Sequence, residues 1–468
     1  MTLPASRFIR TGVPAPCAGA ERFVLSSQAW RDLPAALRAD PALDLIALWA
    51  DPGHVHALFG AASPLIASVP VEAGLYGALS PARPGAALFE RAVADLWGHQ
   101  AADGVDARPW LDHGAWTALR PMADRPAPNT PTPEIPEFHP APPGSAARTH
   151  GPLGNGIVDA PAAWHLATVS GRITQVEARG GFGHRGVLSV MRSRSPTAAA
   201  CIAARISGAA TVAHATAFAR ACEAALNVLV SPRAQALRTL LGAVERVAMA
   251  LHDAATLDAS SALMQARERV LQACTETLGH RLLMDVVVPG GLNADLSLDA
   301  ARLLDAMLDT VPSLPGSGIA GQGRLPVAEA LALGVPGLAG RASGRLDPTT
   351  PGAPLDAAGD VAARVRLRAA ACDADVALAR ETLALLPEGP VLVPLPTASG
   401  EGLGFAKGPY GRVWHWARLQ GGIIAASFAV DPAWLLLPAV ERAGQGAPAA
   451  MLPAIAASFG LHLAGMEL

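Results

Sequence analysis

The residues best suited to chemistry are histidines, arginines and a serine that stand in short glycine-containing strings. The strings are Gly183-His184-Arg185-Gly186, Arg205-Ile206-Ser207-Gly208 with His214 after it, Arg341-Ala342-Ser343-Gly344, and Gly400-Glu401-Gly402 followed by Trp414-His415-Trp416. Imidazole, guanidinium and hydroxyl groups can bind and protonate a polar acceptor. Each string alone also has a structural reading, because a histidine beside an Ala-rich helix usually bonds to a backbone carbonyl. Their order and spacing along the chain carry more information than any one of them.

Signatures of several common chemistries are missing from the sequence. It has no phosphate-binding loop, no dinucleotide fingerprint at a strand-to-helix turn, and no metalloprotease, esterase or kinase signature. The five cysteines are widely spaced and form no C-x-x-C pair. Such spacing favours buried thiols in a reducing cytoplasm, and we expect neither disulfides nor a zinc or iron–sulfur site held by this chain.

Composition narrows the class of partners. The chain has 468 residues, with 36 Lys and Arg against 39 Asp and Glu and a net charge of -3, which argues against nucleic acid or an anionic membrane surface. Only 16% of residues are charged and 51% are hydrophobic, so we expect other subunits to cover part of the surface.

The sequence predicts no membrane span and no secretory signal. A spanning helix needs about 20 uninterrupted apolar residues. The two strongest candidates, 421–440 and 449–466, are interrupted by Asp431-Pro432 and by Pro453 and His462. The first twelve residues lack the apolar run of a secretory signal.

A proline-rich stretch divides the chain. Nine of the twenty-three residues in 121–143 are proline, a density that excludes helices and central strands and predicts an extended linker. The predicted organisation is an N-terminal domain over 1–120, a linker over 121–147 and a larger domain over 148–468.

Hydrophobic periodicity predicts an α+β fold. The front domain is expected to be a small α/β unit, with strands near 23–25 and 43–49 and a helix over 85–98 that ends at Gly98. In the back domain, helical spacing covers 196–230, 232–253, 260–277, 298–308 and 360–386. Strand patterns precede the helices at 164–177 and follow them after Pro396, where Gly421-Gly422 predicts a hairpin turn.

These strings resemble a known pair of subunits. Residues 76–120, with Glu90-Arg91-Ala92-Val93-Ala94-Asp95-Leu96-Trp97-Gly98, look like the signature of the 30-kDa subunit of respiratory complex I, with Ala92 in place of a second glutamate. Residues 148–468 look like the 49-kDa subunit and the large subunit of membrane-bound nickel–iron hydrogenases, which share H-[RK]-G, R-A-S-G, G-D-x-x-A-R and G-E-G motifs. The two parts occur fused in the hydrogenlyase-type large subunit, which this chain resembles in layout.

The departures from that family concern its metal ligands. The hydrogenases hold nickel and iron with two C-x-x-C pairs, and the matching positions here are Ser207 and Ala210, then His462 and Gly465. One hydroxyl and one imidazole cannot replace four thiolates around soft metals. We therefore expect no nickel–iron centre and no hydrogen evolution.

The resemblance implies a vacated cavity beside an iron–sulfur cluster of a partner subunit. The candidate pocket residues are His184, Arg185, Arg205, Ser207, His214, Arg341 and His462, and Asp159 is a possible proton relay. The complex I homologue binds quinone there with a tyrosine and a histidine. Here that tyrosine is missing near Gly208, and His150 and His165 are both candidates for the histidine. The alternative is that these residues only tie helices together.

The resulting functional hypothesis is a peripheral-arm subunit of a membrane-associated redox complex, similar to complex I and the hydrogenases. It would take part in electron transfer from a partner's iron–sulfur cluster while binding no cofactor itself. The alternatives are a quinone-reducing site with a substitute donor, and a non-catalytic structural adaptor. Expected partners are an iron–sulfur small subunit and ion-translocating membrane subunits, which would hold the chain on the cytoplasmic face of the cell membrane.

Overall fold

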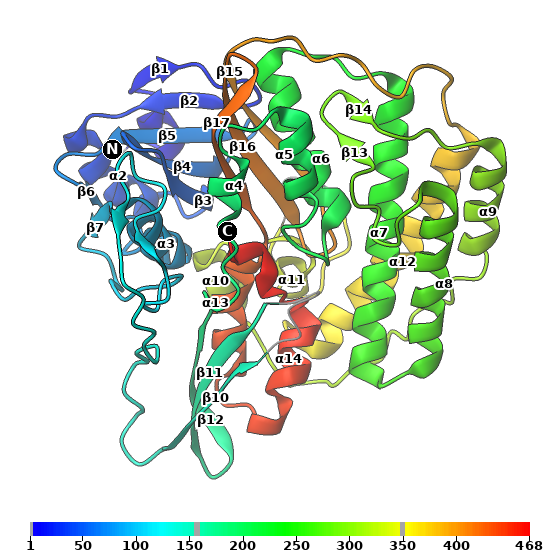
Figure 1. The fold of residues 1–468 in the computed structure, drawn as a ribbon. Coiled ribbons are helices and arrows are strands. Elements are labelled where there is room, and N and C mark those ends of the chain that lie inside the picture. The colour runs from blue at the N-terminus through cyan, green and yellow to red at the C-terminus, as the bar shows by residue number, and fades with distance from the viewer. Residues whose placement is uncertain (1–2, 154–159, 347–351) are drawn as a thin grey trace.

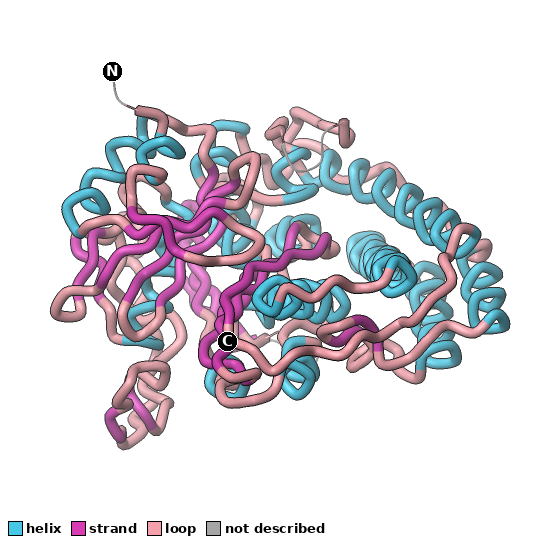
Figure 2. Tube along the Cα trace, turned by 90° about the horizontal axis from the view of Figure 1, so that it is seen from above, coloured by secondary structure: helices cyan, strands magenta, loops and turns pink. Residues whose placement is uncertain are grey.

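The computed structural model describes residues 3–153, 160–346 and 352–468, and these form the mixed α+β fold predicted from the sequence. Strands gather in one half of the molecule, and the long helices fill the other half (Figure 1, Figure 2). None of the described helices is long and apolar enough to span a membrane.

The front part is built on a five-stranded sheet in the order β1-β2-β5-β4-β3. Its strands are β1 (Val13–Ala15), β2 (Glu21–Val24), β3 (Asp44–Ala50), β4 (His54–Gly60) and β5 (Leu65–Pro70). Its helices are α1 (Ala5–Ile9), α2 (Ser27–Ala39) and α3 (Ala87–Trp97), with a parallel pair β6 (Leu75–Gly77) and β7 (Gln100–Ala102). Strands β2 and β5 run parallel and the other neighbours antiparallel. The predicted C-cap Gly98 has the left-handed backbone that ends α3.

The proline-rich segment contains little regular structure. The two-residue strand β8 (Ala118–Leu119) precedes it, and its partner β9 (Ala127–Pro128) lies within it. The chain then enters a three-stranded antiparallel sheet of β10 (Ala146–Leu153), β11 (Ala162–Val169) and β12 (Arg172–Arg179), which extends from the lower edge of the molecule in Figure 1.

The back part is mostly helical, and several of its helices begin at side-chain caps. The helices are α4 (Val187–Met191), α5 (Pro196–Ala203), α6 (Thr211–Leu226), α7 (Pro232–Asp258), α8 (Ser261–Leu278), α9 (Leu298–Leu308), α10 (Val327–Ala332), α11 (Gly337–Ala342) and α12 (Val361–Ala384). The short pair β13 (Val287–Val288) and β14 (Gly291–Leu292) lies between α8 and α9. A serine side chain accepts a backbone N–H in the first turn of α5, α7, α8 and α9, so the sequence itself fixes these starts. One expectation was wrong, because 196–230 is not one helix: α5 and α6 are separated by a loop over 204–210.

The glycine-rich string at 400–404 allows a helix to lie directly on a strand. Strands β15 (Gly400–Lys407), β16 (Arg412–Gln420) and β17 (Ile423–Val430) form an antiparallel sheet, with the predicted turn at Gly421-Gly422. A Cβ atom added to Gly402 or Gly404 would lie 2.3 Å from a backbone carbonyl oxygen of α6. Alternate glycines therefore give β15 a flat face for α6. Helices α13 (Ala433–Gly444) and α14 (Leu452–Phe459) and the C-terminal tail follow.

Front and back parts share one hydrophobic core and a buried polar network. Trp49 of β3 stacks on Phe428 of β17 at a centroid distance of 5.9 Å. Ala18, in the loop between β1 and β2, forms an isolated β-bridge with Gly402, which brings this loop beside β15.

The polar network crosses the same boundary. Its members are Arg22, Asp51, His56, Ser68, Glu401 and Arg418. Ion pairs of Arg22 and Arg418 with Glu401, and of Arg418 with Asp51, join the two parts.

Candidate functional site

Two segments far apart in sequence meet beside α6. The first is the loop between α5 and α6, which contains Ser207 and Ala210, and the second is the C-terminal tail after α14. The Arg185 guanidinium joins them, donating to the carbonyl oxygens of Ile206 at 2.6 Å and Ala464 at 3.1 Å. We use the name chamber for the buried region where this loop, the tail and the start of α6 meet.

A buried aspartate fills part of the chamber. The Asp431 carboxylate is 3.0 Å from Nε2 of His214, whose Nδ1 is 3.0 Å from Nε2 of His415. Asp431 also accepts the Ala433 N–H. A Cβ atom on Gly465 would lie 2.3 Å from the Asp431 Cγ. The carboxylate therefore occupies the volume that a side chain at position 465 would need.

The chamber does not fit a nickel–iron centre. Ser207, Ala210, His462 and Gly465 supply no thiolate between them, and a side chain at position 465 is excluded by Asp431. Within the residues that the structure describes, no group of three or more His, Cys, Asp or Glu side chains is placed to hold a metal ion.

A tyrosine reaches the chamber from the β15–β16 connection. The Tyr410 hydroxyl lies 2.9 Å from Nε2 of His462 and donates to the Asp253 carboxylate at 3.2 Å. Asp253 is also paired with Arg368 at 3.1 Å. Burial raises the pKa of Asp253 to about 6 and lowers that of His462 to about 4, and it raises the pKa of Tyr410 well above its ordinary value. His462 is therefore neutral near pH 7, and its Nε2 either donates a hydrogen bond to the Tyr410 hydroxyl or accepts one from it, depending on the tautomer.

Several polar atoms around the chamber have no hydrogen-bond partner among the described residues. They are Nδ1 of His184, His415 and His462, and Nη1 of Arg368. The His184 ring packs on Trp116 at a centroid distance of 4.4 Å, and burial lowers its pKa to about 4. Unpartnered buried polar atoms are costly, so their concentration here marks a place where water or a ligand would bind.

Not every predicted residue faces the chamber. Arg205 forms a half-exposed ion pair with Asp285, with distances of 2.5 and 2.7 Å. Arg341 donates to the carbonyl of Pro354. Asp159, the possible proton relay, lies outside the described residues. Among the pocket candidates, His184, Arg185, Ser207, His214 and His462 are the ones that lie around the loop and the tail.

The two candidates for a quinone-binding histidine lie on the sheet that extends from the molecule. His150 is on β10 and is exposed, whereas His165 on β11 is 2.9 Å from the Thr149 hydroxyl and stacks on Phe138. Neither of these contacts involves the loop or the tail of the chamber.

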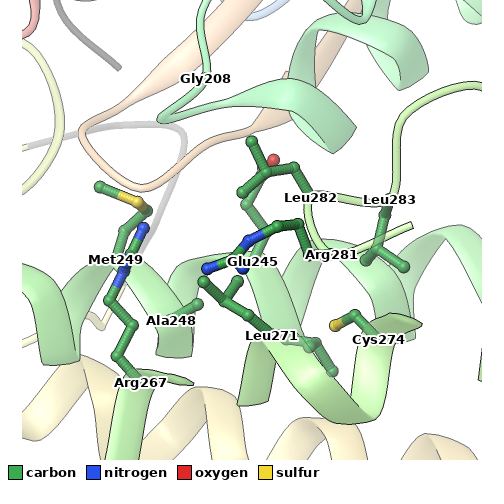
Figure 3. Close-up of a pocket in the computed structure, with 11 residues that line it drawn as sticks. Gly208, Glu245, Ala248, Met249, Arg267, Leu271, Cys274, Arg281, Leu282 and Leu283 are labelled. Carbon is green, nitrogen blue, oxygen red and sulfur yellow. The ribbon is translucent and has the colours of Figure 1, made fainter. Parts of the chain in front are cut away.

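A small pocket opens beside the α5–α6 loop. About 340 Å³ of space lies between its atoms, part of it open to solvent. It is lined by Gly208, Val244, Glu245, Ala248, Met249, Arg267, Leu271, Cys274, Arg281, Leu282 and Leu283 (Figure 3). The Glu245 carboxyl accepts the N–H groups of Val212 and Ala213 at 2.5 and 3.1 Å, which caps the first turn of α6 from another helix. Burial raises the pKa of Glu245 to about 8.

Sequence reasoning missed Tyr410, Asp253, Asp431 and Glu245. Asp431 carried a usable signal, since it is a carboxylate inside an apolar run. Tyr410 is one of only two tyrosines in the chain, but no local pattern indicates that it meets His462, 52 residues away.

Comparisons with known proteins agree with this geometry. Residues 185–255, which run from the arginine that joins loop and tail to near the end of α7, match the nickel-dependent hydrogenase family. The chain is 24% identical to the carbon monoxide-induced hydrogenase of Rhodospirillum rubrum over 286 residues, covering 53% of this chain and 79% of that protein. It is 25% identical to the membrane-bound hydrogenase subunit alpha of Pyrococcus furiosus over 308 residues, covering 55% of this chain and 72% of that subunit.

A solved structure shows the same fold. A chain of the membrane-bound sulfane sulfur reductase, an archaeal respiratory membrane complex, matches with a TM-score of 0.61 at 20% identity, covering 70% of this chain and 100% of that chain. The hydrogenase part of the resemblance predicted from the motifs is thus confirmed as a similarity: residues 185–255 match the nickel-dependent hydrogenase family, and the similar proteins include a subunit of a membrane-bound hydrogenase.

Proposed function

We propose that this chain is the large-subunit-like component of a membrane-bound redox complex that works without a nickel–iron centre. Electrons from an iron–sulfur cluster in a partner subunit reach the chamber region, where a small acceptor is reduced. The chain positions the acceptor and sets the electrostatic environment around it, and it holds no redox cofactor itself. Ion-translocating membrane subunits complete the complex and keep this chain at the cytoplasmic face of the membrane.

The observation that carries the proposal is the remodelled chamber. The loop and the tail meet at Arg185, yet the positions matched to the four thiolates hold Ser207, Ala210, His462 and Gly465, and Asp431 occupies the space that a side chain at position 465 would need. Retained architecture supports an assembly with partner subunits, and the changed donor set supports chemistry other than hydrogen evolution.

The proposal is tested by purifying the chain together with its co-isolating subunits and measuring metals by mass spectrometry. We expect several iron atoms per complex, with nickel below one tenth of the chain concentration. Stoichiometric nickel would contradict the ligand argument, and a complex free of iron would contradict the electron-transfer role. A matched preparation of a nickel-containing hydrogenase serves as the positive control.

A second candidate is quinone reduction, which Tyr410 favours. Its hydroxyl is hydrogen-bonded to His462 at 2.9 Å, so a tyrosine–histidine pair exists although the tyrosine comes from a different part of the chain than expected. In the described geometry the Tyr410 hydroxyl is bonded to Asp253 and His462, so a quinone carbonyl would have to displace one of these contacts, whereas Nδ1 of His462 has no partner among the described residues. Quinone-dependent oxidation of the reduced complex that is lost in Tyr410→Phe would favour this candidate over reduction of another acceptor.

The third candidate is an adaptor that keeps only partner-binding surfaces. It predicts that Tyr410→Phe and His462→Gln leave electron flow through the isolated complex unchanged. A loss of flow in either variant, with subunit composition preserved, would exclude the adaptor.

A further inference from the structure

The pocket beside Gly208 has two guanidinium groups in its wall. Arg267 comes from α8, and Arg281 follows the end of that helix. Figure 3 shows both side chains directed into the pocket, with Arg267 extending towards Met249 and Arg281 entering from the side of Leu282. The remaining wall is mostly apolar, with Val244, Leu271, Cys274, Leu282 and Leu283.

The two cations lie close enough to repel each other. Burial lowers the pKa of Arg267, and the charge of Arg281 lowers it further. Nε of Arg267 is buried and has no hydrogen-bond partner among the described residues. Arg281 uses one nitrogen, Nη2, in a half-exposed pair with Glu268 at 2.8 Å. The buried Nε of Arg267 is costly to leave without a partner, and an anion between the two guanidiniums would bond to Arg267 and offset the repulsion from Arg281.

The carboxylates nearby do not neutralise this charge. Glu268 is at the surface beside Arg281, and Asp253 is already bonded to Arg368 and Tyr410. Three guanidiniums, those of Arg267, Arg281 and Arg368, therefore share two carboxylates, which leaves one positive charge in excess.

Glu245 does not change this balance near neutral pH. Both of its oxygens accept backbone N–H groups of α6, and a pKa of about 8 keeps the carboxyl mostly protonated at pH 7. His252, next to Asp253 on α7, is also neutral there, because burial lowers its pKa.

We propose that Arg267 and Arg281 form a binding site for a small monovalent oxyanion of the carboxylate type. Its two oxygens would take N–H donors from both guanidiniums, and its short apolar part would lie against Met249 and Leu271. The space that remains between the lining side chains is narrow, so the site admits only the smallest oxyanions. The site is a property of the chain itself and does not depend on the electron-transfer role.

The test titrates sodium acetate into the purified complex by calorimetry at constant ionic strength and pH 7. Acetamide, which has nearly the same shape without charge, and sodium chloride are titrated separately. We expect saturable acetate binding, no heat from acetamide, and at least tenfold weaker affinity for chloride. Equal binding of acetate and acetamide would overturn the proposal, as would no acetate binding at millimolar concentration. Titration with sodium hydrogensulfite then shows whether the site prefers a sulfur oxyanion to a carboxylate.

Variants locate the site. Arg281→Gln, at the more exposed edge of the pocket, should weaken acetate binding at least tenfold, and Arg267→Gln should do the same where the variant folds. Arg302→Gln is the matched control, because Arg302 is an exposed arginine on α9 paired only at the surface with Asp299. Unchanged affinity in Arg281→Gln, or an equal loss in Arg302→Gln, would contradict the assignment. Since binding is measured without a reductant, failure here leaves the metal analysis of the complex unaffected.

Discussion

Two buried polar regions of this molecule differ in how completely their groups are satisfied. At the boundary between the front and back parts, Arg22 and Arg418 pair with Glu401, Arg418 with Asp51, and His56 bonds to both Asp51 and Ser68. None of these six side chains has an unpartnered buried atom. Around the chamber, by contrast, three histidines and Arg368 each have a nitrogen without a partner in the described structure.

The difference separates a closed structural network from a region with unused hydrogen-bonding capacity. The order Ser68–His56–Asp51 has the residue types of a nucleophilic triad, but Ser68 is fully buried and its hydroxyl also accepts a hydrogen bond from Arg22. A closed network of this kind fixes how two sheets meet. Residue type alone therefore misleads, whereas unused hydrogen-bonding capacity points to the chamber and its pocket.

The largest effect should come from opening the boundary network. Glu401→Ala leaves Arg22 and Arg418 buried with one carboxylate fewer, so we expect the free energy of unfolding to fall by about 3–5 kcal/mol. Urea denaturation followed by tryptophan fluorescence measures it. Glu21→Ala, which removes the exposed partner of Arg10, should cost less than about 1 kcal/mol. Equal losses in the two variants would remove the distinction between a buried network and a surface pair.

The next largest loss of stability should come from adding a side chain at position 465, where Asp431 already occupies the space. Gly465→Ala places a Cβ atom against Asp431, and we expect a loss of about 2–3 kcal/mol from overpacking. The double variant with Asp431→Ala should lose less than the sum of the two single variants, because the clash disappears. Strict additivity in this thermodynamic cycle would show that position 465 and Asp431 do not compete for the same space.

Glu245 should make the free energy of unfolding depend on pH. Burial raises its pKa from 4.5 to about 8, so the folded chain holds this proton more tightly than the unfolded chain. The stability that Glu245 contributes is complete below about pH 4.5 and is lost as pH rises towards 8. We expect Glu245→Gln, compared with the natural chain, to flatten the pH dependence of unfolding by up to about 5 kcal/mol across this range. A parallel pH dependence in both proteins would contradict the assignment.

Among the variants of the buried regions, Tyr410→Phe should change the stability least. It removes one hydroxyl that bonds to Asp253 and His462, at a cost of about 1 kcal/mol. Thermal unfolding of the complex measures this change. If the chamber is functional, the same variant alters electron flow far more than stability. A loss as large as that of Glu401→Ala would make Tyr410 a structural residue like those of the boundary network.

The sequence predicted the parts of the fold that depend on local pattern. Long Ala- and Leu-rich periods placed α8 and α9 within one or two residues, and Gly421-Gly422 located the β16–β17 turn. The loop before α6 was missed because the start of that helix is capped by Glu245, which lies on α7. The helical propensity of residues 196–230 cannot indicate a cap that comes from a side chain on a different helix.

The candidate site was predicted less completely for the same reason. Motifs identified Arg185, Ser207, His214 and His462, all of which lie around the chamber. Their partners Tyr410, Asp431 and Asp253 are distant in sequence, and only the fold brings them together. Arg205 has the right motif position, but its side chain is held at the surface by Asp285.

The bond from Arg185 to Ala464 has a consequence for how this chain folds. It joins residues 279 positions apart, so the two ends of a very long loop must come together before it can form. Closing such a loop costs more chain entropy than forming a helix, whose contacts are local. Contacts of this span therefore usually form late in folding. We therefore expect the tail after α14 to acquire protection from amide hydrogen exchange after α7 and α8 during refolding.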